Sequence, residues 1–463
     1  MKKNAKKETK EEFTGRYLVL LPEGTSAEEF KNELNASKDV QVKSSLDYEN
    51  EFFTESDLDE TDGIILDKIG VAILNDKPVL NNLVSTLEGT GIIVEPERVV
   101  YAINLLDEKT QNYVEGYRDA INQLADVLIG DDMEQDDSEL EDYSDAQSVG
   151  STWGLRATMV TPTSFLQQMR WTGNGIKVAI LDTGFDLNHP DFINRPIVSK
   201  SFITGESVQD EHGHGTHCTG TACGGLSPAG SIERYGIAYK SSIYIGKVLN
   251  NAGRGADGGI LAGINWAVAN GCEIVSMSLG GTMNSAGFSA VFENAAARAL
   301  NSGTLIIAAA GNSSSRPNNI RAVSHPANCP SIMAVGALDS GLNCATFSNG
   351  GLYATYGSVD IAGPGVGVFS STKMPAKHST MNGTSMATPH VAGIAALWAE
   401  STGLRGINLW KKLVSTAKGL PLPTRDVGAG LVQAPYTIRY IRPIPFPRYP
   451  ELPKFPVQPP IIK

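Results

Sequence analysis

The sequence has no long apolar run and few cysteines, and each absence excludes a class of protein. No stretch approaches the roughly 18 consecutive apolar residues of a membrane-spanning helix, and the opening MKKNAKKETKEEF lacks the apolar core of a secretory signal. The five cysteines form an odd set without CxxC pairs, which argues against a disulfide framework and against a zinc site. We therefore expect mostly buried thiols, no zinc site and no membrane partner. We expect a cytoplasmic location, with secretion by another route left open.

Positive charge is also scarce, and the chain is long. The formal net charge is −12, from 38 Lys and Arg against 50 Asp and Glu, whereas a nucleic-acid partner requires a concentrated basic face. We therefore expect no nucleic acid among the partners. At 463 residues the chain exceeds the roughly 250 to 300 residues at which single cores stop growing, so it has room for more than one domain.

The N-terminal third divides into three parts by its pattern. Residues 1–15 are polar and charged, and we expect a flexible tail there. Residues 16–105 alternate short strands with two helical stretches in the order βαββαβ, which is typical of a small ferredoxin-like α+β domain. GIILDKIGVAIL counts as one strand of this pattern, and KPVLNNLVSTLEG as its second helix. Residues 106–150 hold a possible helix and then DDMEQDDSELEDYSD, a self-repelling run that predicts an exposed acidic linker.

The remaining two thirds are dominated by one α/β domain, residues 151–436. Its apolar runs, among them KVAILD, SIYIGKVL, EIVSMSL and TLIIAAA, alternate with helical stretches. Because these runs are continuous rather than alternating, they predict a parallel sheet covered on both faces by helices. Residues 437–463 form a proline-rich tail, for which we expect polyproline II structure.

Two segments place reactive side chains at the ends of expected elements. VAILDTGFDLNHPDF puts Asp182 at the carboxyl end of an apolar strand, where catalytic groups gather in open α/β sheets, although an isolated Asp could simply cap a turn. DEHGHGTHCTG crowds His212, His214 and His217 between glycines. A metal site is the alternative for these histidines, but HExxH is absent and only the adjacent Cys218 could add a ligand.

A third segment, NGTSMATPHVAG, places Ser385 at a helix start, where the helix dipole favours developing negative charge. An isolated serine there could be a simple N-cap. GTSMA loosely resembles the GxSxG elbow of α/β-hydrolases, but those enzymes place Asp and His after the serine, and the only later histidine is His390 on the same helix. The order Asp182, His214, Ser385 is instead that of the subtilisin class.

Five blocks, LDTGFDLNHPDF, HGHGTHCTG, SMSLGG, AAAGN and GTSMATPHVAG, resemble in sequence and order the signatures of subtilisin-like serine peptidases over residues 153–432. The resemblance implies a subtilisin-like α/β fold in which Ser385 attacks the scissile carbonyl, His214 takes its proton and Asp182 orients His214. It also implies an oxyanion hole made by Asn312 and the backbone amide of Ser385. This chemistry needs no cofactor.

The resemblance also implies a substrate-binding cleft. One edge of its pocket falls on Ser278, Leu279 and Gly280, and the other edge falls on Ala310 and Gly311. The strand that pairs with the substrate backbone falls on Gly253 and Gly255. We expect no metal among the catalytic and substrate-binding residues. The run GRGADG also fits GxGxxG, but its turn is lengthened and no suitably spaced acidic residue ends a second strand, so a dinucleotide site is the weaker interpretation.

Three further features come from the resemblance alone. Residues 16–105 resemble the family's propeptide, which implies an inhibitor that the enzyme cuts from itself, with a first cut near 103–106 and later trimming before Ser151. The family often carries a structural calcium beside the position of Asp191, but GGLSPAGSIERYG offers no Asn or Asp, so calcium is only an open option here. Cys218 matches a position where some relatives carry a cysteine beneath the catalytic histidine.

The sequence thus predicts a serine endopeptidase that is made as a self-processing zymogen and acts on proteins or peptides. Two alternatives stay open. The unusual linker and tail favour a narrow processing peptidase that acts on one partner protein. The other alternative is a catalytically inactive scaffold that binds peptides in the substrate-binding cleft, although all four residues of the expected site are present: Asp182, His214, Ser385 and Asn312.

Overall fold

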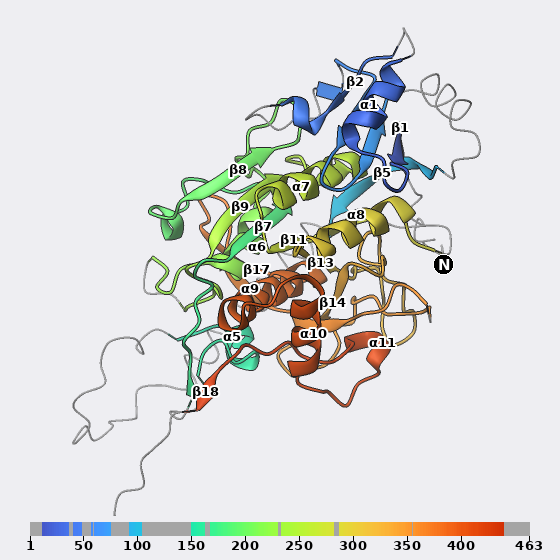
Figure 1. The fold of residues 1–463 in the computed structure, drawn as a ribbon. Coiled ribbons are helices and arrows are strands. Elements are labelled where there is room, and N and C mark those ends of the chain that lie inside the picture. Colours follow the sequence, from blue (N-terminus) through green and yellow to red (C-terminus); the bar gives the residue numbers. More distant parts are fainter. Residues whose placement is uncertain are drawn as a thin grey trace, which may run out of the picture.

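The structure is a computed structural model that describes most of the chain (Figure 1). The described residues are 12–36, 40–48, 57–58, 60–75, 92–103, 150–162, 167–229, 233–281, 287–353 and 355–438. Several expectations fall outside them: the second helix of the N-terminal part, the acidic linker with its possible helix, and all but the start of the proline-rich tail.

The N-terminal unit, residues 12–103, contains a twisted sheet with helix α1 (Ala27–Asn35) packed on it. The helix begins after a reciprocal capping box between Ser26 and Glu29. The strands follow the spatial order β5 (Val94–Ala102), β1 (Phe13–Leu20), β4 (Val71–Leu74), β3 (Gly63–Leu66) and β2 (Val42–Ser44).

Two details of this unit differ from the expected pattern. β1 begins at Phe13, inside the segment expected to be a tail, because Phe13 pairs with Arg98 of β5. GIILDKIGVAIL is not one strand but the antiparallel hairpin of β3 and β4. The turn between them, Asp67 to Gly70, reverses the chain and lets both apolar halves lie side by side in the sheet.

Side chains on the two faces of this N-terminal sheet belong to different cores. Val19 shares a cluster with Phe30 of α1. Its neighbour Leu18 points to the opposite face, as successive strand residues do, and shares a cluster with Ile260 and Phe292 of the main domain. The N-terminal unit is therefore packed onto the main domain through a continuous apolar core (Figure 1).

The main domain is built on a seven-stranded sheet in which every neighbouring pair is parallel. Its spatial order is β15 (Ile361–Pro364), β14 (Met333–Leu338), β13 (Leu305–Ala309), β11 (Ile274–Met277), β7 (Lys177–Asp182), β9 (Ser242–Lys247) and β8 (Ile197–Ser201). The helices are α5 (Trp153–Ala157), α6 (His214–Cys223), α7 (Asp257–Ala269), α8 (Ala290–Asn301), α9 (Thr384–Thr402), α10 (Gly406–Thr416) and α11 (Thr424–Val427).

Short strands complete the domain. The antiparallel pairs are β16 (Val368–Ser371) with β17 (His378–Met381) and β6 (Gln167–Gln168) with β18 (Thr437–Ile438). Two more, β10 (Arg254–Ala256) and β12 (Leu279–Gly280), pair with β5 of the N-terminal unit. β5 therefore lies between two segments of the main domain, which is the contact that brings the N-terminal unit to the site described below.

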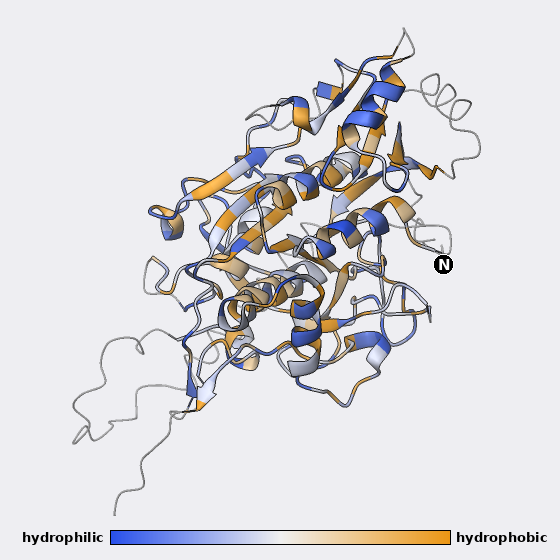
Figure 2. Ribbon diagram, in the orientation of Figure 1, coloured by the Kyte–Doolittle hydropathy of each residue, from blue (hydrophilic) through white to orange (hydrophobic). Residues whose placement is uncertain are grey.

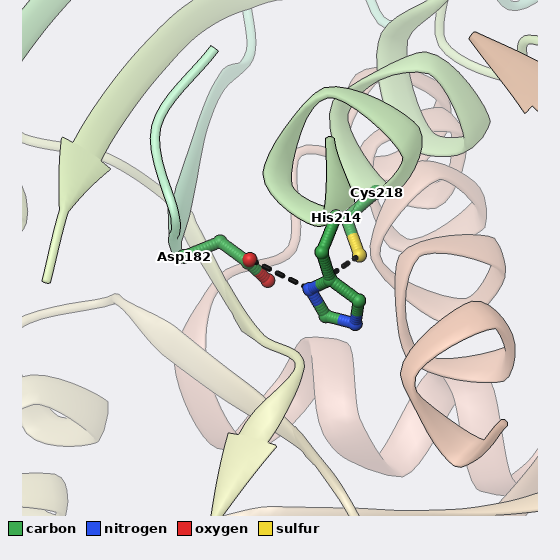
Figure 3. Close-up of side chains that lie close together, drawn as sticks. All are labelled: Asp182, His214 and Cys218. Carbon is green, nitrogen blue, oxygen red and sulfur yellow. Dashed lines mark hydrogen bonds and ion pairs between the residues drawn. The ribbon is translucent and has the colours of Figure 1, made fainter. Parts of the chain in front are cut away.

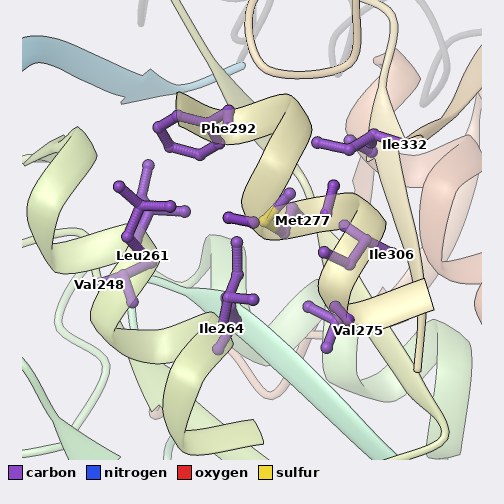
Figure 4. Close-up of a cluster of buried hydrophobic side chains, with 14 of the residues drawn as sticks. Val248, Leu261, Ile264, Val275, Met277, Phe292, Ile306 and Ile332 are labelled. Carbon is purple, nitrogen blue, oxygen red and sulfur yellow. The ribbon is translucent and has the colours of Figure 1, made fainter. Parts of the chain in front are cut away.

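Helices cover both faces of the parallel sheet, as its continuous apolar strands predict. On β7, Val178 and Ile180 share a core cluster with residues of α6 and α9, whereas Ala179 and Leu181 share the other with residues of α7 and α8. Figure 4 shows part of the second cluster, including Val248, Leu261 and Phe292. Figure 2 shows apolar residues along the central strands and hydrophilic residues over much of α1.

Helix α9 is central to the domain and begins at the carboxyl edge of the sheet. Its small residues allow close packing against α6: a Cβ added at Gly393 would lie 2.8 Å from the Ala222 carbonyl oxygen of α6 and 2.8 Å from Ile237 Cβ. Pro389 is accommodated in the early part of the helix. In the described residues no helix combines the length and hydropathy of a membrane span.

Candidate active site

Asp182 and His214 form a buried pair at the carboxyl edge of the sheet (Figure 3). Asp182 is the last residue of β7 and His214 the first residue of α6. Asp182 Oδ1 lies 2.7 Å from His214 Nδ1 and also accepts the Thr183 backbone N–H at 2.7 Å. Both side chains are at most 1% exposed. Nδ1 therefore carries the proton that points to the carboxylate, which leaves Nε2 as the basic nitrogen.

Sequence reasoning did not single out Asp210, which fastens the two segments that carry this pair. Its buried carboxylate accepts five hydrogen bonds: from Thr183 Oγ1, His212 N and Gly213 N on Oδ1, and from Thr216 N and Oγ1 on Oδ2. It thereby ties the turn after β7 to the first turn of α6. The only signal in the sequence was its position at the head of the DEHGHG block.

The other two histidines of that block do not join His214 in a metal site. His217 Nε2 lies 3.0 Å from the Val368 carbonyl oxygen of β16. The His212 ring stands edge-on to the His214 ring, with centroids 6.1 Å apart. The metal alternative for these three histidines therefore has no support in the described residues.

Ser385 and Asn312 converge on one carbonyl oxygen, that of Ile103. Ser385 Oγ donates to it at 2.7 Å, and Asn312 Nδ2 donates to it at 3.0 Å. The Asn312 amide is held in this orientation because its Oδ1 accepts the Thr384 N–H and hydroxyl, each at 2.9 Å. The carbonyl of the last described residue of the N-terminal unit is thus held by a hydroxyl and an amide donor.

The hydrogen bond between Ser385 and His214 is not formed in this arrangement. The Ser385 hydroxyl points to the Ile103 oxygen and lies 3.2 Å from the Ser278 oxygen, and His214 Nε2 is buried without a partner among the described residues. Such hydrogen bonds often form fully only when substrate is positioned for reaction.

The expected substrate strand positions are occupied by β5. It pairs antiparallel with β10 on one side, Arg254 opposite Tyr101, and with β12 on the other, Leu279 opposite Ala102. The Gly253 oxygen accepts the Ala102 N–H at 2.8 Å. The expected residues Gly253, Gly255, Ser278, Leu279 and Gly280 therefore flank a single extended strand, which is the geometry of recognition by strand addition.

The Ile103 side chain lies against the expected pocket edge. A Cβ added at Gly280 would stand 2.9 Å from Ile103 Cδ1 and 2.7 Å from the His325 oxygen, so only glycine leaves this space open. Gly311 is crowded similarly by Ser324 Oγ. Ala310 is fully buried and its oxygen accepts the Ser324 N–H, so its part in the pocket stays a prediction.

Comparison of the sequence with known proteins identifies one family. The profile of the subtilase family matches residues 173–430. The chain belongs to the subtilase family. It is 40% identical over 292 residues to subtilisin BL of Lederbergia lenta and 39% identical over 292 residues to subtilisin Savinase of the same organism, covering 62% of this chain and 98% of each relative. It is 38% identical over 257 residues to subtilisin DY of Bacillus licheniformis, covering 55% of this chain and 88% of that protein.

Several expectations are confirmed by this membership. The subtilase is a serine endopeptidase with a subtilisin-like α/β fold, it acts on protein or peptide substrates, and it needs no cofactor for catalysis. The dinucleotide alternative has no support, because the segment that fits GxGxxG forms β10 and the start of α7 beside β5.

The expected cytoplasmic location is wrong. The subtilisin relatives are secreted extracellular proteases, and nothing supports a cytoplasmic place for this subtilase. The expectation relied on thiols without pairing partners and on the composition of the first residues. Four of the five free cysteines are buried, and burial by itself makes a thiol unreactive. Their free state is therefore no evidence for a reducing compartment.

The charges around His214 favour a strong base. Burial by itself would lower the pKa of His214, but the neighbouring Asp182 carboxylate raises it well above the usual value. Cys218 Sγ lies 4.0 Å from His214 Nδ1 (Figure 3). It also lies 3.5 Å from the Ser385 backbone oxygen. Burial raises the pKa of the Cys218 thiol, so the sulfur stays protonated and the carboxylate is the main cause of the His214 shift.

The position of Cys218 predicts sensitivity to mercurials. A mercury atom on its sulfur would displace the His214 ring, and misplacing a catalytic group by about 1 Å costs about 10²-fold in rate. We expect a mercurial to lower peptidase activity by about this factor, slowly because Cys218 is fully buried. Residual activity after incubation is the measurement.

Cys218→Ala should make the enzyme resistant. Cys223→Ala is the matched control, because Cys223 is a buried thiol on the same helix and its loss should leave the sensitivity unchanged. A Cys218→Ala enzyme that is inhibited as strongly as the wild type would refute this explanation.

Proposed function

We propose that Ser385 is the nucleophile of this endopeptidase, His214 its general base and Asp182 the group that orients His214. The observation that supports this assignment is the Ile103 carbonyl, whose oxygen receives hydrogen bonds from Ser385 Oγ and Asn312 Nδ2. A substrate carbonyl in that place would have its carbon next to Oγ, and its oxygen would become negative beside an amide donor that cannot ionise.

The remaining steps follow from the same residues. As Ser385 Oγ attacks, its proton passes to His214 Nε2, and the charge on the imidazolium is balanced by Asp182 at 2.7 Å. His214 then returns the proton to the leaving amine, and water hydrolyses the ester on Ser385 in a second round of the same transfers. Asn312 stabilises the oxyanion in both rounds.

We propose further that residues 12–103 act as an inhibitor in the enzyme's own precursor. β5 lies in the substrate strand position and ends with the Ile103 carbonyl next to Ser385. Two buried or half-buried carboxylates anchor it: Glu97 Oε1 accepts Gly258 N–H at the start of α7, and Glu95 Oε1 accepts Ala290 N–H at the start of α8. Acidic side chains are stabilising at helix N-termini.

This arrangement narrows the expected first self-cut to the bond after Ile103. Wild-type chain purified in full length and incubated should release a fragment that ends at Ile103, because that carbonyl alone among the described residues contacts both Ser385 and Asn312. Intact-mass spectrometry over time is the measurement. Trimming before Ser151 should follow more slowly.

The Ser385→Ala chain is the control for this experiment and should keep its full length. A wild-type enzyme that reached full activity without losing residues 1–103 would contradict the zymogen proposal, whereas a first cut at another bond would contradict only the assignment of Ile103.

The structural calcium that the resemblance allows is not part of the proposal, because the residues around Asp191 do not fit it. Asp191 Oδ1 accepts the Ala229 N–H at 2.7 Å, and Oδ2 is hydrogen-bonded by the Tyr235 hydroxyl and by His378 Nε2. Calcium takes six to eight oxygen ligands, whereas imidazole nitrogens lie beside this carboxylate.

A further inference from the structure

A second group of metal-ligating side chains lies apart from the residues proposed for catalysis. His189 and Asp191 flank Pro190 at the start of a short 3₁₀ helix (Pro190–Phe192), and His378 is the first residue of β17. One ligand atom from each of the three lies within 4.8 Å of the others. His378 and Asp191 are 187 positions apart in the sequence, so only the fold brings them together.

The hydrogen bonds of His189 set which of its nitrogens carries a lone pair. Nε2 lies 2.6 Å from the Lys377 carbonyl oxygen, and a carbonyl can only accept, so Nε2 carries the proton. Nδ1 is therefore the unprotonated nitrogen, and it faces the Asp191 backbone N–H at a long 3.2 Å. Histidine ligands commonly donate their second N–H to a carbonyl in this way, which fixes the ring for metal binding.

The carboxylate and the second imidazole complete a set of donors of mixed type. The Asp191 side chain is fully buried, and His378 Nε2 lies 2.9 Å from its Oδ2. Since a carboxylate can only accept, His378 Nε2 carries a proton here, and a bound metal ion would replace this proton, which passes to solvent. The Tyr235 hydroxyl donates to the same oxygen and would remain an outer partner that orients the carboxylate. His378 is 13% exposed, so the group is not completely sealed from solvent.

We propose that His189, Asp191 and His378 bind one divalent transition-metal ion, with zinc as the best match. Two imidazole nitrogens and one carboxylate oxygen, with water as a fourth ligand, are a donor set that zinc accepts and that calcium does not. Tetrahedral zinc with ligands at about 2.1 Å places them about 3.4 Å apart. The three ligand atoms already lie within 4.8 Å of one another, and the pair Asp191 Oδ2 and His378 Nε2, now 2.9 Å apart, would widen slightly on binding.

The ion would join two segments that border the proposed catalytic residues. β17 continues through Asn382 and Gly383 into α9, which carries Ser385 near its start. The chain just before β17 is already joined to the segment that leads from β7 to His189, because Asp186 Oδ2 accepts the Met374 N–H at 2.6 Å. We therefore expect zinc to raise the melting temperature of the chain without taking part in peptide hydrolysis.

The test is isothermal titration of zinc chloride into the full-length chain with Ser385→Ala, which prevents self-digestion, and Cys218→Ala, which removes the thiol from the group Asp182, His214 and Cys218. We expect saturation at one zinc per chain, a higher melting temperature, and no comparable effect of calcium chloride. Adding His378→Gln should weaken zinc binding by more than about 100-fold, since losing even an outer partner costs about 10 to 100-fold.

Tyr235→Phe is the matched control, because it removes a hydrogen bond to Asp191 and keeps all three ligands, so zinc should still bind at the same stoichiometry. Cobalt chloride should give the visible absorption of a nitrogen and oxygen site, and the spectrum should disappear with His378→Gln. No saturable zinc binding by the background chain, or equal affinity with and without His378, would overturn the proposal.

Discussion

Ser385→Ala is expected to lower peptide hydrolysis by about 10⁶-fold, the loss that is usual when a nucleophile of this class is removed. The substitution deletes one oxygen that donates to Ile103 and approaches the Ser278 carbonyl, and leaves the apolar contacts of α9 in place. The melting temperature should therefore change little. Hydrolysis of a chromogenic peptide is the measurement, with melting followed in parallel.

Ser276→Ala is the matched control for this experiment. Ser276 is also a buried serine of the main domain, on β11, but its hydroxyl has no hydrogen-bond partner among the described residues. Its loss should leave hydrolysis within about two-fold of the wild type, since no reacting group is touched. A Ser385→Ala protein, separated from its N-terminal segment, that kept more than about 10⁻³ of the activity would contradict the proposed mechanism.

Asn312→Ala is expected to lower kcat by about 10² to 10³-fold, the usual cost of removing one oxyanion donor, with KM nearly unchanged. The physical reason is that Nδ2 reaches an oxygen whose negative charge grows only in the transition state, as its 3.0 Å contact with the Ile103 oxygen indicates. Steady-state kinetics on the processed enzyme separate kcat from KM.

The amide of Asn312 also holds Thr384, so a second variant is needed to separate catalysis from local structure. Asn312→Asp keeps the acceptor for Thr384 and loses the donor, and should lose at least as much kcat as Asn312→Ala. Asn343→Ala, which removes a side-chain amide that donates to Asp339 in an exposed turn, should have no effect. A rise in KM with kcat retained would show that Asn312 binds substrate without stabilising its oxyanion.

Much of the architecture could be predicted because its signals are local. Continuous apolar runs such as KVAILD are buried on both faces of the parallel sheet, and the helix with Ser385 begins where its small residues and Pro389 indicate. The hairpin of β3 and β4 was missed because both halves are equally apolar and equally buried, so periodicity alone does not mark the turn between them.

The sequence by itself determined the candidate chemistry: the order Asp182, His214, Ser385, the amide of Asn312, and the family of the fold. These residues can be recognised from short stretches of sequence, because the glycines and small residues that give each side chain its space are its close neighbours in the chain. The tertiary structure alone decided that β5 lies between β10 and β12, that Ile103 ends beside Ser385, and that His378 reaches Asp191. These contacts join segments far apart in the chain, and burial and pairing over such distances leave no periodic pattern in either segment.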